Sequence, residues 1–359
     1  MRISIHKDHL GTNRHLEYDG DNFSWVKDIS QESYIFGSNS GFDLAESISV
    51  AGSKIQTFED TPYAKATDNM GGYYIDTLSA NREVLDRLQS PLVDIPMLKS
   101  IIAKSSQSKS YDLVRFLPKG KDNLAPKTKY SMGGSITGRL TVSSGPNILT
   151  LKRSHRAIMK SRFDGGNIVQ ADISSLEPRI ALSVAGKQPP DDIYSHVCEK
   201  LFGGKLSRSQ AKQSILTCIY GGSSWTLGKV LSSDANPEKI LKDVKKYFEI
   251  ENLNKNLETE VLDKGFITNL YGRRIMSGES LVNHFLQSTG VDVSLSVFRS
   301  LLSSLDASDV DYVPIYVIHD AIVLDVSSSA LEALRGICEE SFQVDGIKCK
   351  FPLKVDIIS

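Results

Sequence analysis

The sequence predicts an α/β protein of the α+β kind, with an antiparallel sheet beside several helices. NIVQADISSLEPRIALSVAG (167–186) begins as an apolar strand that ends at an acid and then takes on helical spacing. DYVPIYVIHDAIVLDVS (311–327) contains two apolar runs around His319-Asp320, a pattern typical of a hairpin. PEKILKDVKKYFEIENLNKNLETEVLD (236–262) has the apolar spacing of one long amphipathic helical region.

The other elements are predicted in order along the chain. Residues 1–90 have the composition of short strands and turns, with turn-rich breaks at YIFGSNSGFD and DNMGGYYID. Residues 90–110 have helical apolar spacing with lysines on the other face, and 117–129 are typical of an exposed basic loop. Residues 207–222 predict a further helix, and KCKFPLKVDIIS predicts a closing strand.

The composition is that of a globular protein. Hydrophobic residues make up 40% and charged residues 24% of the 359 positions, which is enough chain for two or three structural units. No apolar run of about 18 residues occurs and MRISIHKDHLGTN lacks a signal-peptide core, so we expect a cytoplasmic protein without membrane contact. The 4 cysteines form no CxxC pair, which predicts reduced thiols and argues against a zinc site. The net charge of −1 neither supports nor excludes nucleic acid.

Two acids mark the ends of predicted strands. Asp172 ends the strand IVQAD and Asp320 lies at the hairpin tip, where an accessible carboxylate can bind a hard cation. Alone, each Asp is better explained as an ordinary turn residue. Arg208 and Lys212 lie four residues apart and therefore share one helix face. Together the four side chains supply what phosphoryl transfer needs, namely carboxylates for Mg²⁺ and cations for a triphosphate.

Over residues 128–359 the sequence resembles the family A DNA polymerases, the DNA polymerase I family. SITGRLTVSSGPNI is similar to the TGRL segment that grips the primer-template, and ADISSLEPRI resembles motif A. RSQAKQSILTCIYGG resembles motif B, the fingers helix, and VIHDAIVLDV resembles motif C. KGFITNLYGRR, NHFLQSTGVD and FPLKVDI resemble the family's linking and closing segments. Each pattern is short, but their shared order and spacing indicate the family.

The resemblance implies a metal site. Asp172 and Asp320 would hold two Mg²⁺ ions, with Mn²⁺ as an alternative ion, and the backbone carbonyl of Ile173 would be a further ligand. One ion would lower the pKa of the primer 3′-OH, and the other would steady the triphosphate and the pyrophosphate. His319 is expected to orient the hairpin or the primer end and not to bind metal. Lys212 is a candidate proton donor to pyrophosphate, with simple phosphate steering as the alternative.

The resemblance also implies a nucleotide site on the motif B helix. Arg208 and Lys212 would contact the β/γ and α phosphates of a dNTP. Tyr220 would stack near the incoming base or the template position, and Gly221 would permit a close approach there. Without the family, Tyr220 is better explained as a core aromatic residue.

Two positions would touch the sugar of the nucleotide. Glu177 matches the motif A glutamate that excludes a ribose 2′-OH, and this points to DNA synthesis; a solvent-facing helix Glu is the alternative. Leu216 stands where motif B usually has an aromatic residue, so selection against dideoxynucleotides is expected to differ.

A further set matches positions that line the duplex near the primer terminus. These residues would hydrogen-bond to minor-groove acceptors and phosphates, which tests the shape of a base pair without identifying its sequence. An ordinary surface or helix-pairing role is the alternative for each of them. The set consists of Arg139, Asn147, Arg273, Asn283 and Gln287.

Two further motif positions, besides Leu216, depart from the family pattern. Motif C usually reads His-Asp-Glu, but Ala321 follows Asp320 here, so metal binding would rest on two acids. Ile173 replaces the tyrosine that often follows the motif A aspartate. Only about 127 residues precede the matched region, which is shorter than in the usual family member. We therefore expect no nuclease activity, and either a minimal polymerase, with a phage as the candidate source, or one part of a split enzyme.

The resemblance implies a right-hand polymerase with an antiparallel palm sheet, helical fingers and a reduced thumb. We expect an N-terminal extension and the start of the palm in 1–84, the thumb in 85–127, palm with motif A in 128–184, fingers with motif B in 185–265, and palm with motif C in 266–359. The expected partners are primer-template DNA and dNTPs, with a separate exonuclease, clamp or helicase as further candidates. A phage-encoded protein would work in the bacterial host cytoplasm.

Two rival functions remain open. A single-subunit RNA polymerase or primase-like enzyme would use rNTPs and start without a primer. A binding relic would keep the basic helix without the metal acids, but both acids are present. Metal-dependent primer extension separates the three.

Overall fold

A computed structural model of the chain describes residues 72–105, 107–132, 135–231, 235–275 and 279–359, together with the backbone of four short N-terminal strands. These strands form one sheet in the order β3-β2-β1-β4. In it β1 pairs with β2 antiparallel and with β4 parallel. Their bounds are β1 Arg2–Ile5, β2 His15–Tyr18, β3 Phe23–Val26 and β4 Ser33–Phe36.

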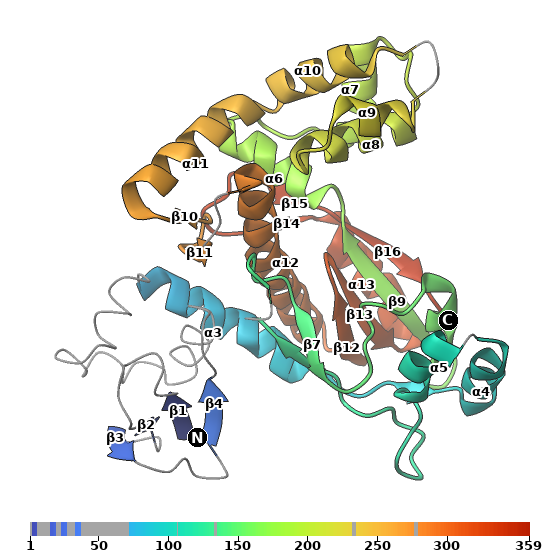
Figure 1. Cartoon of the computed structure of the whole chain (residues 1–359). Coiled ribbons are helices and arrows are strands. Elements are labelled where there is room, and N and C mark those ends of the chain that lie inside the picture. The colour runs from blue at the N-terminus through green and yellow to red at the C-terminus, as the bar shows by residue number, and fades with distance from the viewer. Residues whose placement is uncertain are drawn as a thin grey trace.

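A second four-stranded sheet forms the centre of the molecule (Figure 1). Its strand order is β12-β13-β9-β16, and every neighbouring pair is antiparallel. Its strands are rich in Ile and Val, which favour a pleated and buried surface. All six side chains of β13 are buried, so the sheet is covered on both faces. The bounds are β9 Asn167–Ile173, β12 Tyr312–Ile318, β13 Ala321–Val326 and β16 Leu353–Ile357.

The long helix α12 (Leu281–Ala307) is the main support of this sheet region. It packs against α3 (Gly72–Arg87), α6 (Leu176–Val184), α11 (Ile250–Lys264) and α13 (Ser328–Glu339). Its buried side chains point in nearly every direction around the helix, as expected for a helix surrounded by protein.

The helices that follow β9 and precede α12 in the chain form the upper lobe in Figure 1. Local signals set the ends of these helices. Ser207 and Gln210 form a reciprocal capping box at the start of α8, and Asp192 caps α7 with its side chain. The members after α6 are α7 Ile193–Phe202, α8 Arg208–Ile219, α9 Ser224–Gly228, α10 Pro237–Tyr247 and α11.

Small elements complete the fold beside the central sheet. Asp94 accepts a hydrogen bond from Met97 N at 2.9 Å and starts α4, which leads into α5. The basic segment 117–129 is largely exposed, as predicted. These elements are β5 Leu92–Val93, α4 Ile95–Lys104, α5 Gln107–Val114, β6 Lys129–Ser131, β7 Thr141–Ser144, the 3₁₀ helix η3 Arg153–Ile158, β8 Met159–Lys160, β10 Ile267–Thr268, β11 Arg274–Ile275, β14 Phe342–Gln343 and β15 Lys350–Phe351.

The predicted α/β class is confirmed, and one local prediction is wrong. Residues 72–87 form the helix α3, although strands and turns were expected up to residue 90. The region predicted as helical at 236–262 is helical and consists of two helices, because Glu249 has a φ of 54° and breaks the run between α10 and α11. The break YIFGSNSGFD lies mostly outside the described residues.

The cysteines and the helices bear out two further expectations. Cys198, Cys218, Cys338 and Cys349 are all buried and free. Within the described part of the chain, no helix has the length and hydropathy needed to cross a membrane.

Candidate active site

The two predicted acids come together at one end of the two middle strands of the central sheet. Asp172 lies opposite Ala321 in the β9–β13 ladder, so it is the cross-strand neighbour of the residue after Asp320. Ile173 N donates a hydrogen bond to the carbonyl of Asp320 at 2.9 Å. The turn between β12 and β13 is made possible by His319, which has a φ of 55°. Antiparallel pairing thus brings residues 148 positions apart in sequence side by side.

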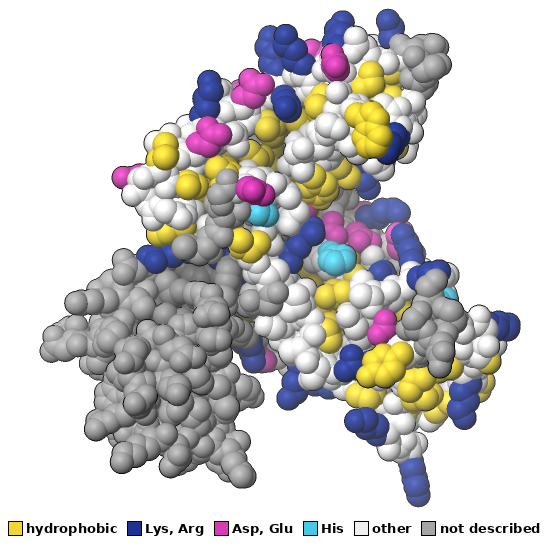
Figure 2. All heavy atoms as spheres, viewed as in Figure 1, with side chains coloured by type: hydrophobic (Ala, Val, Ile, Leu, Met, Phe, Trp, Pro, Cys, Tyr) yellow, Lys and Arg dark blue, Asp and Glu magenta, His cyan; other side chains and the backbone are white. Residues whose placement is uncertain are grey.

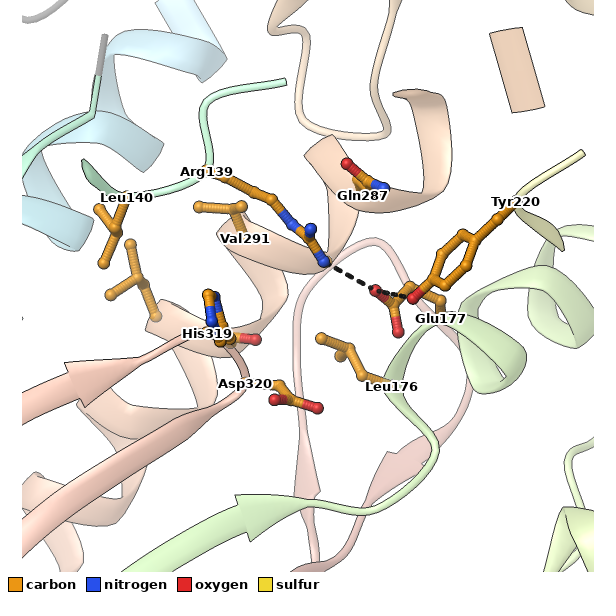
Figure 3. A pocket seen from close by; sticks show the side chains of 12 residues that line it. Arg139, Leu140, Leu176, Glu177, Tyr220, Gln287, Val291, His319 and Asp320 are labelled. Atoms are coloured by element: carbon orange, nitrogen blue, oxygen red, sulfur yellow. Dashed lines mark hydrogen bonds and ion pairs between the residues drawn. The ribbon is translucent and has the colours of Figure 1, made fainter. Parts of the chain in front are cut away.

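A cleft of about 220 Å³ opens beside Asp320 (Figure 3). The turn between β12 and β13 contributes Asp320 and His319, and α12 contributes Gln287. Glu177 enters from the first turn of α6, and Tyr220 enters from the end of α8. Arg139 reaches in from the segment before β7. Six residues that the sequence analysis singled out therefore line one cavity.

Burial dominates the electrostatics of the acid pair. Burial raises the pKa of the Asp172 carboxyl, the bond from Gln170 opposes this, and the charge of Asp320 raises it further. Burial also raises the pKa of Asp320, against the influence of Arg139 and Lys212. A divalent cation between the carboxylates would relieve this repulsion.

Asp172 has a hydrogen-bond partner that sequence analysis missed. Gln170 Nε2 lies 2.9 Å from Oδ1 and 2.8 Å from Oδ2 of Asp172. Arg156 Nη1 in turn donates to Gln170 Oε1 at 2.7 Å. Gln170 stands two residues before Asp172 on β9, and period-two alternation puts both on one face. A polar residue in the otherwise apolar run IVQAD was the available signal.

Glu177 lies at the centre of the cleft in a small polar network. Its Oε1 accepts a hydrogen bond from the Tyr220 hydroxyl at 3.4 Å and lies 3.6 Å from Arg139 Nη2 (Figure 3). Burial raises the pKa of the Glu177 carboxyl, and the charge of Asp320 raises it further. Burial, with the charge of Glu177, raises the pKa of Tyr220 to about 12. The glutamate is therefore held by partners and is not the solvent-facing residue that was the alternative.

The cations of α8 gather around one aromatic ring. The Arg208 guanidinium carbon lies 5.2 Å and Lys212 Nζ lies 5.6 Å from the ring centroid of Tyr194. Arg208 Nε also donates to Asp192 Oδ2 at 2.7 Å. Burial raises the pKa of Asp192, but the bonds from Arg208 and Ser195 outweigh burial and bring it to about 2.

These contacts hold the face of α8 on which the sequence predicts phosphate contacts. The charge of Lys212 opposes the burial that raises the pKa of Asp320. Arg208 is directed toward Asp192, and neither Arg208 nor Lys212 is among the residues that line the cleft. The roles of Asp192 and Tyr194 were missed, although an Asp just before a helical run is a recognisable capping signal.

The residues predicted to contact the sugar and the base lie along α8 and at its end. Leu216 is half-buried, one turn before Tyr220, whose side chain is 39% exposed. Tyr220 is therefore not the core aromatic residue of the alternative explanation. Gly221 has a φ of 71°, and open space surrounds the position a β-carbon would take.

The predicted duplex-contacting residues separate into two groups. Gln287 lines the cleft, and its Nε2 donates to Asn283 Oδ1 at 2.6 Å, one turn earlier on α12. Asn147 does not line the cleft; its Oδ1 accepts from Leu149 N at 3.2 Å in a local turn. The Arg139 side chain is 43% exposed and stays accessible from the cleft.

Arg273 has a different place from the one expected. Its side chain is 0% exposed, lies 3.3 Å from the equally buried Asp292, and donates to the carbonyl of Met132. Asn269 Nδ2 donates to the same Asp292 at 2.6 Å. A side chain without exposed surface has no direct access to DNA in this conformation, so the contact expected for Arg273 is corrected to a buried ion pair.

The surface around the cleft has mixed charge. Figure 2 shows acidic, basic and histidine side chains meeting in the hollow between the upper helices and the central sheet. Lys152, Arg153, His155 and Arg156 come from η3 and the residue before it, beside the strand that carries Asp172. Local basic surface of this kind suits a polyanion even though the whole chain is nearly neutral.

Comparison with known proteins identifies a matching family and two relatives. A family model described as DNA polymerase family A matches residues 58–359. The DNA polymerase I of Streptococcus pneumoniae serotype 4 (strain ATCC BAA-334 / TIGR4) and that of strain ATCC BAA-255 / R6 are each 23% identical over 267 residues. The matched part covers 64% of this chain and 30% of each relative, so the chain spans less than a third of these curated relatives.

The fold also has a counterpart among solved structures. The POL domain of Pol1 from M. smegmatis, in complex with DNA primer-template and dNTP, superposes with a TM-score of 0.53 and 15% sequence identity. The match covers 89% of this chain and 66% of that chain. At this identity the similarity establishes the architecture, a polymerase-domain fold of helices and antiparallel sheet.

Proposed function

The chain belongs to DNA polymerase family A, and from this premise we propose that it adds deoxynucleotides to a primer 3′ end under template direction. The observation that carries the proposal is the β9–β13 register, which brings Asp172 beside Asp320, within the electrostatic influence of Lys212 on α8. Acids on one side and cations on the other are the two requirements of phosphoryl transfer.

The donor set at this end of the sheet fits Mg²⁺. Asp172 and Asp320 offer hard carboxylate oxygens, and the Ile173 carbonyl is a candidate further ligand. In the described part of the chain no group of three or more His, Cys, Asp or Glu could hold a metal ion, so nucleotide phosphates and water would complete the coordination. Two Mg²⁺ ions bound there would neutralise charge on the 3′-oxygen and on the triphosphate. We infer that Mn²⁺ can replace them, because it accepts the same ligands.

The protein's own groups would then orient the substrate. Lys212 would bind the α phosphate, and its position near Asp320 suits it to donate a proton to departing pyrophosphate. Arg208 would bind the β/γ phosphates after leaving Asp192, since its side chain is 58% exposed and the exchange requires little rearrangement. Tyr220 and Gly221 would meet the base pair, and Leu216 the sugar.

Glu177 would select the sugar by its position. It is held in the cleft by Tyr220 and Arg139, so a ribose 2′-OH would collide with a side chain that cannot move away cheaply. Asn147, Asn283, Gln287 and Arg139 would contact the primer-template, and His319 would orient the hairpin or the primer end.

The domain assignment is part of the same proposal. The upper helices would be fingers (185–265), the central sheet and α12 the palm (128–184 and 266–359), and the short α4 and α5 a reduced thumb (85–127). Residues 1–84 would hold the N-terminal extension and the start of the palm. The small size of α4 and α5 supports a weak grip on the duplex, so a separate clamp, helicase or exonuclease is the kind of partner we propose.

One primer-extension assay tests the function. The full chain is incubated with a labelled primer-template and dNTPs, with Mg²⁺, with Mn²⁺ or with EDTA. We expect extension that copies the template and requires the metal. Failure to extend with either metal, by a folded protein that binds the duplex, would favour a binding relic or a polymerase that lacks its split partner.

Two added arms address the rival activities. With rNTPs and template alone, synthesis would identify an RNA polymerase or primase-like enzyme, and we expect none. With a mismatched primer and no dNTPs, shortening would identify a nuclease, and we again expect none.

A further inference from the structure

The carboxylate of Asp172 is held by one side chain. Gln170 Nε2 approaches both carboxylate oxygens, at 2.9 and 2.8 Å, so the amide nitrogen lies in front of the carboxylate, between its two oxygens. A carboxylate has about four lone-pair sites, and this contact leaves one outward-facing lone pair on each oxygen for a cation.

The orientation of the Gln170 amide is determined by its neighbours. Arg156 can only donate and an ionised Asp172 can only accept, so Oε1 must face Arg156 and Nε2 must face Asp172. The Gln170 side chain is 6% exposed, and water has little opportunity to replace these bonds. The guanidinium charge polarises the amide and strengthens its donation to Asp172.

This support matters because the site has few ligands. Ala321 occupies the place next to Asp320 where motif C usually supplies another acid, so two carboxylates must hold the cations. When only two carboxylates bind the cations, free rotation of one of them lowers metal affinity more than it would in a site with three. In known metal sites, hydrogen-bond partners of the ligands set ligand orientation and metal affinity.

We propose that Gln170, backed by Arg156, is a positioning residue that holds the Asp172 carboxylate in the orientation required for divalent-metal binding. The inference rests on the proposed function, because Asp172 is a metal ligand only in that function. It also predicts that Gln170 never touches nucleotide, since its amide is fully used by Arg156 and Asp172.

The experiment measures metal binding directly. Mn²⁺ is titrated into the full-length protein and free Mn²⁺ is followed by electron paramagnetic resonance, with Asp172→Asn defining the binding that depends on the site. Gln170→Met keeps the length of the side chain and removes the donor. We expect it to weaken the Asp172-dependent Mn²⁺ affinity about tenfold, the low end for loss of such a partner.

Two variants separate positioning from simple stability. Gln188→Met removes a hydrogen bond to the carbonyl of Lys348 far from the acids, and should leave Mn²⁺ affinity unchanged. Arg156→Met leaves the Gln170 amide in place without its charged partner, and should weaken affinity by a smaller factor of about three. The double variant Gln170→Met/Arg156→Met should be no worse than Gln170→Met alone, because the two residues act in series.

Steady-state kinetics give a second readout. In Gln170→Met we expect the Mg²⁺ concentration for half-maximal extension to rise about tenfold while the KM for dNTP stays unchanged. Equal Mn²⁺ affinity in wild type and a folded Gln170→Met would overturn the inference and leave the function intact. If Gln170→Met does not fold, unchanged affinity in Arg156→Met overturns it instead. Absence of Asp172-dependent Mn²⁺ binding in the wild type would count against the proposed function itself.

Discussion

The guanidinium of Arg273 occupies the space that a β-carbon on Gly138 would fill. Gly138 has a φ of 73°, and the buried Arg273 is in turn held by Asp292 on α12. The backbone before Arg139 therefore packs on a charged group that is itself fixed to α12. Arg273 acts on the cleft at a distance, through the placement of the segment that carries Arg139.

Substitution of Gly138 by Ala should cost much more than its backbone strain alone. A positive φ costs an L-residue about 1–2 kcal/mol. The new methyl group would also displace Arg273 and break a buried ion pair, which typically costs about 3–5 kcal/mol. Gly186→Ala is the matched control, because Gly186 has a φ of 70° with open space around it. Urea unfolding should separate the two variants by at least about 2 kcal/mol, and equal losses would show that Arg273 yields freely.

Removal of either acid should abolish synthesis without loss of the fold. Asp172→Ala and Asp320→Ala each remove half of the carboxylate ligands, and the remaining acid cannot hold the cations alone. We expect primer extension to fall by at least about 10³-fold while duplex binding in a gel-shift assay survives. Burial raises the pKa of both acids, so neither variant should be less stable than wild type.

Asp164→Ala is the control for this pair. Asp164 is exposed in a turn before β9 and makes no contribution to the cleft. Its extension rate should equal that of the wild type. Full activity in Asp172→Ala or Asp320→Ala would refute the proposed metal site.

We expect Glu177 to exclude ribonucleotides by the size of its side chain and not by its charge. Glu177→Ala opens the space that a 2′-OH would need, whereas Glu177→Gln keeps the bulk and the bond to Tyr220. An overpacking cost of about 1.4–3 kcal/mol corresponds to about 10- to 150-fold discrimination. We expect the rNTP/dNTP ratio of kcat/KM to rise by that factor in Glu177→Ala and to change little in Glu177→Gln. Equal rNTP/dNTP ratios of kcat/KM in wild type, Glu177→Ala and Glu177→Gln would show that Glu177 does not select the sugar.

The Arg208–Asp192 pair should make the stability of the protein depend on pH in the acid range. The folded pKa of Asp192, about 2, lies below its ordinary value of 3.8, so the pair stabilises the protein above pH 4 and the contribution disappears as pH falls toward 2. Both side chains are about half exposed, which limits the gain to about 0.5 kcal/mol. Asp192→Asn preserves the helix cap and removes the charge. Its Tm deficit relative to wild type should shrink between pH 4 and pH 2; a constant deficit would contradict the assignment.

The sequence predicted the sheet better than its surroundings. β9, β12 and β13 follow from apolar runs bounded by turn residues, and these signals are local. The helix α3 was missed because GYYIDTLSANREVLDR has weak amphipathic spacing and its stability comes from packing on α12. The break at Glu249 was missed because no Gly or Pro marks it.

The site was predictable wherever a motif carried it. Glu177, Tyr220 and Asp320 were named from the sequence and meet in one cleft. Arg273 was misplaced because a motif match gives a residue its position in the chain but not its burial, and Asp292, its partner, lies on another helix. Arg156 carried no local signal, since its contact with Gln170 exists only after β9 is in place.

The pairing of β9 with β13 has a consequence for how this chain can vary. Alternate side chains of a strand point to opposite faces, so one added or deleted residue between Ile168 and Asp172 would send Asp172 to the far side of the sheet. In the same way, one residue added to or deleted from the two-residue turn at His319 and Asp320 would shift the pairing of β12 with β13. Relatives of this protein can therefore change many side chains here, but they should keep the spacing of these two segments to the residue.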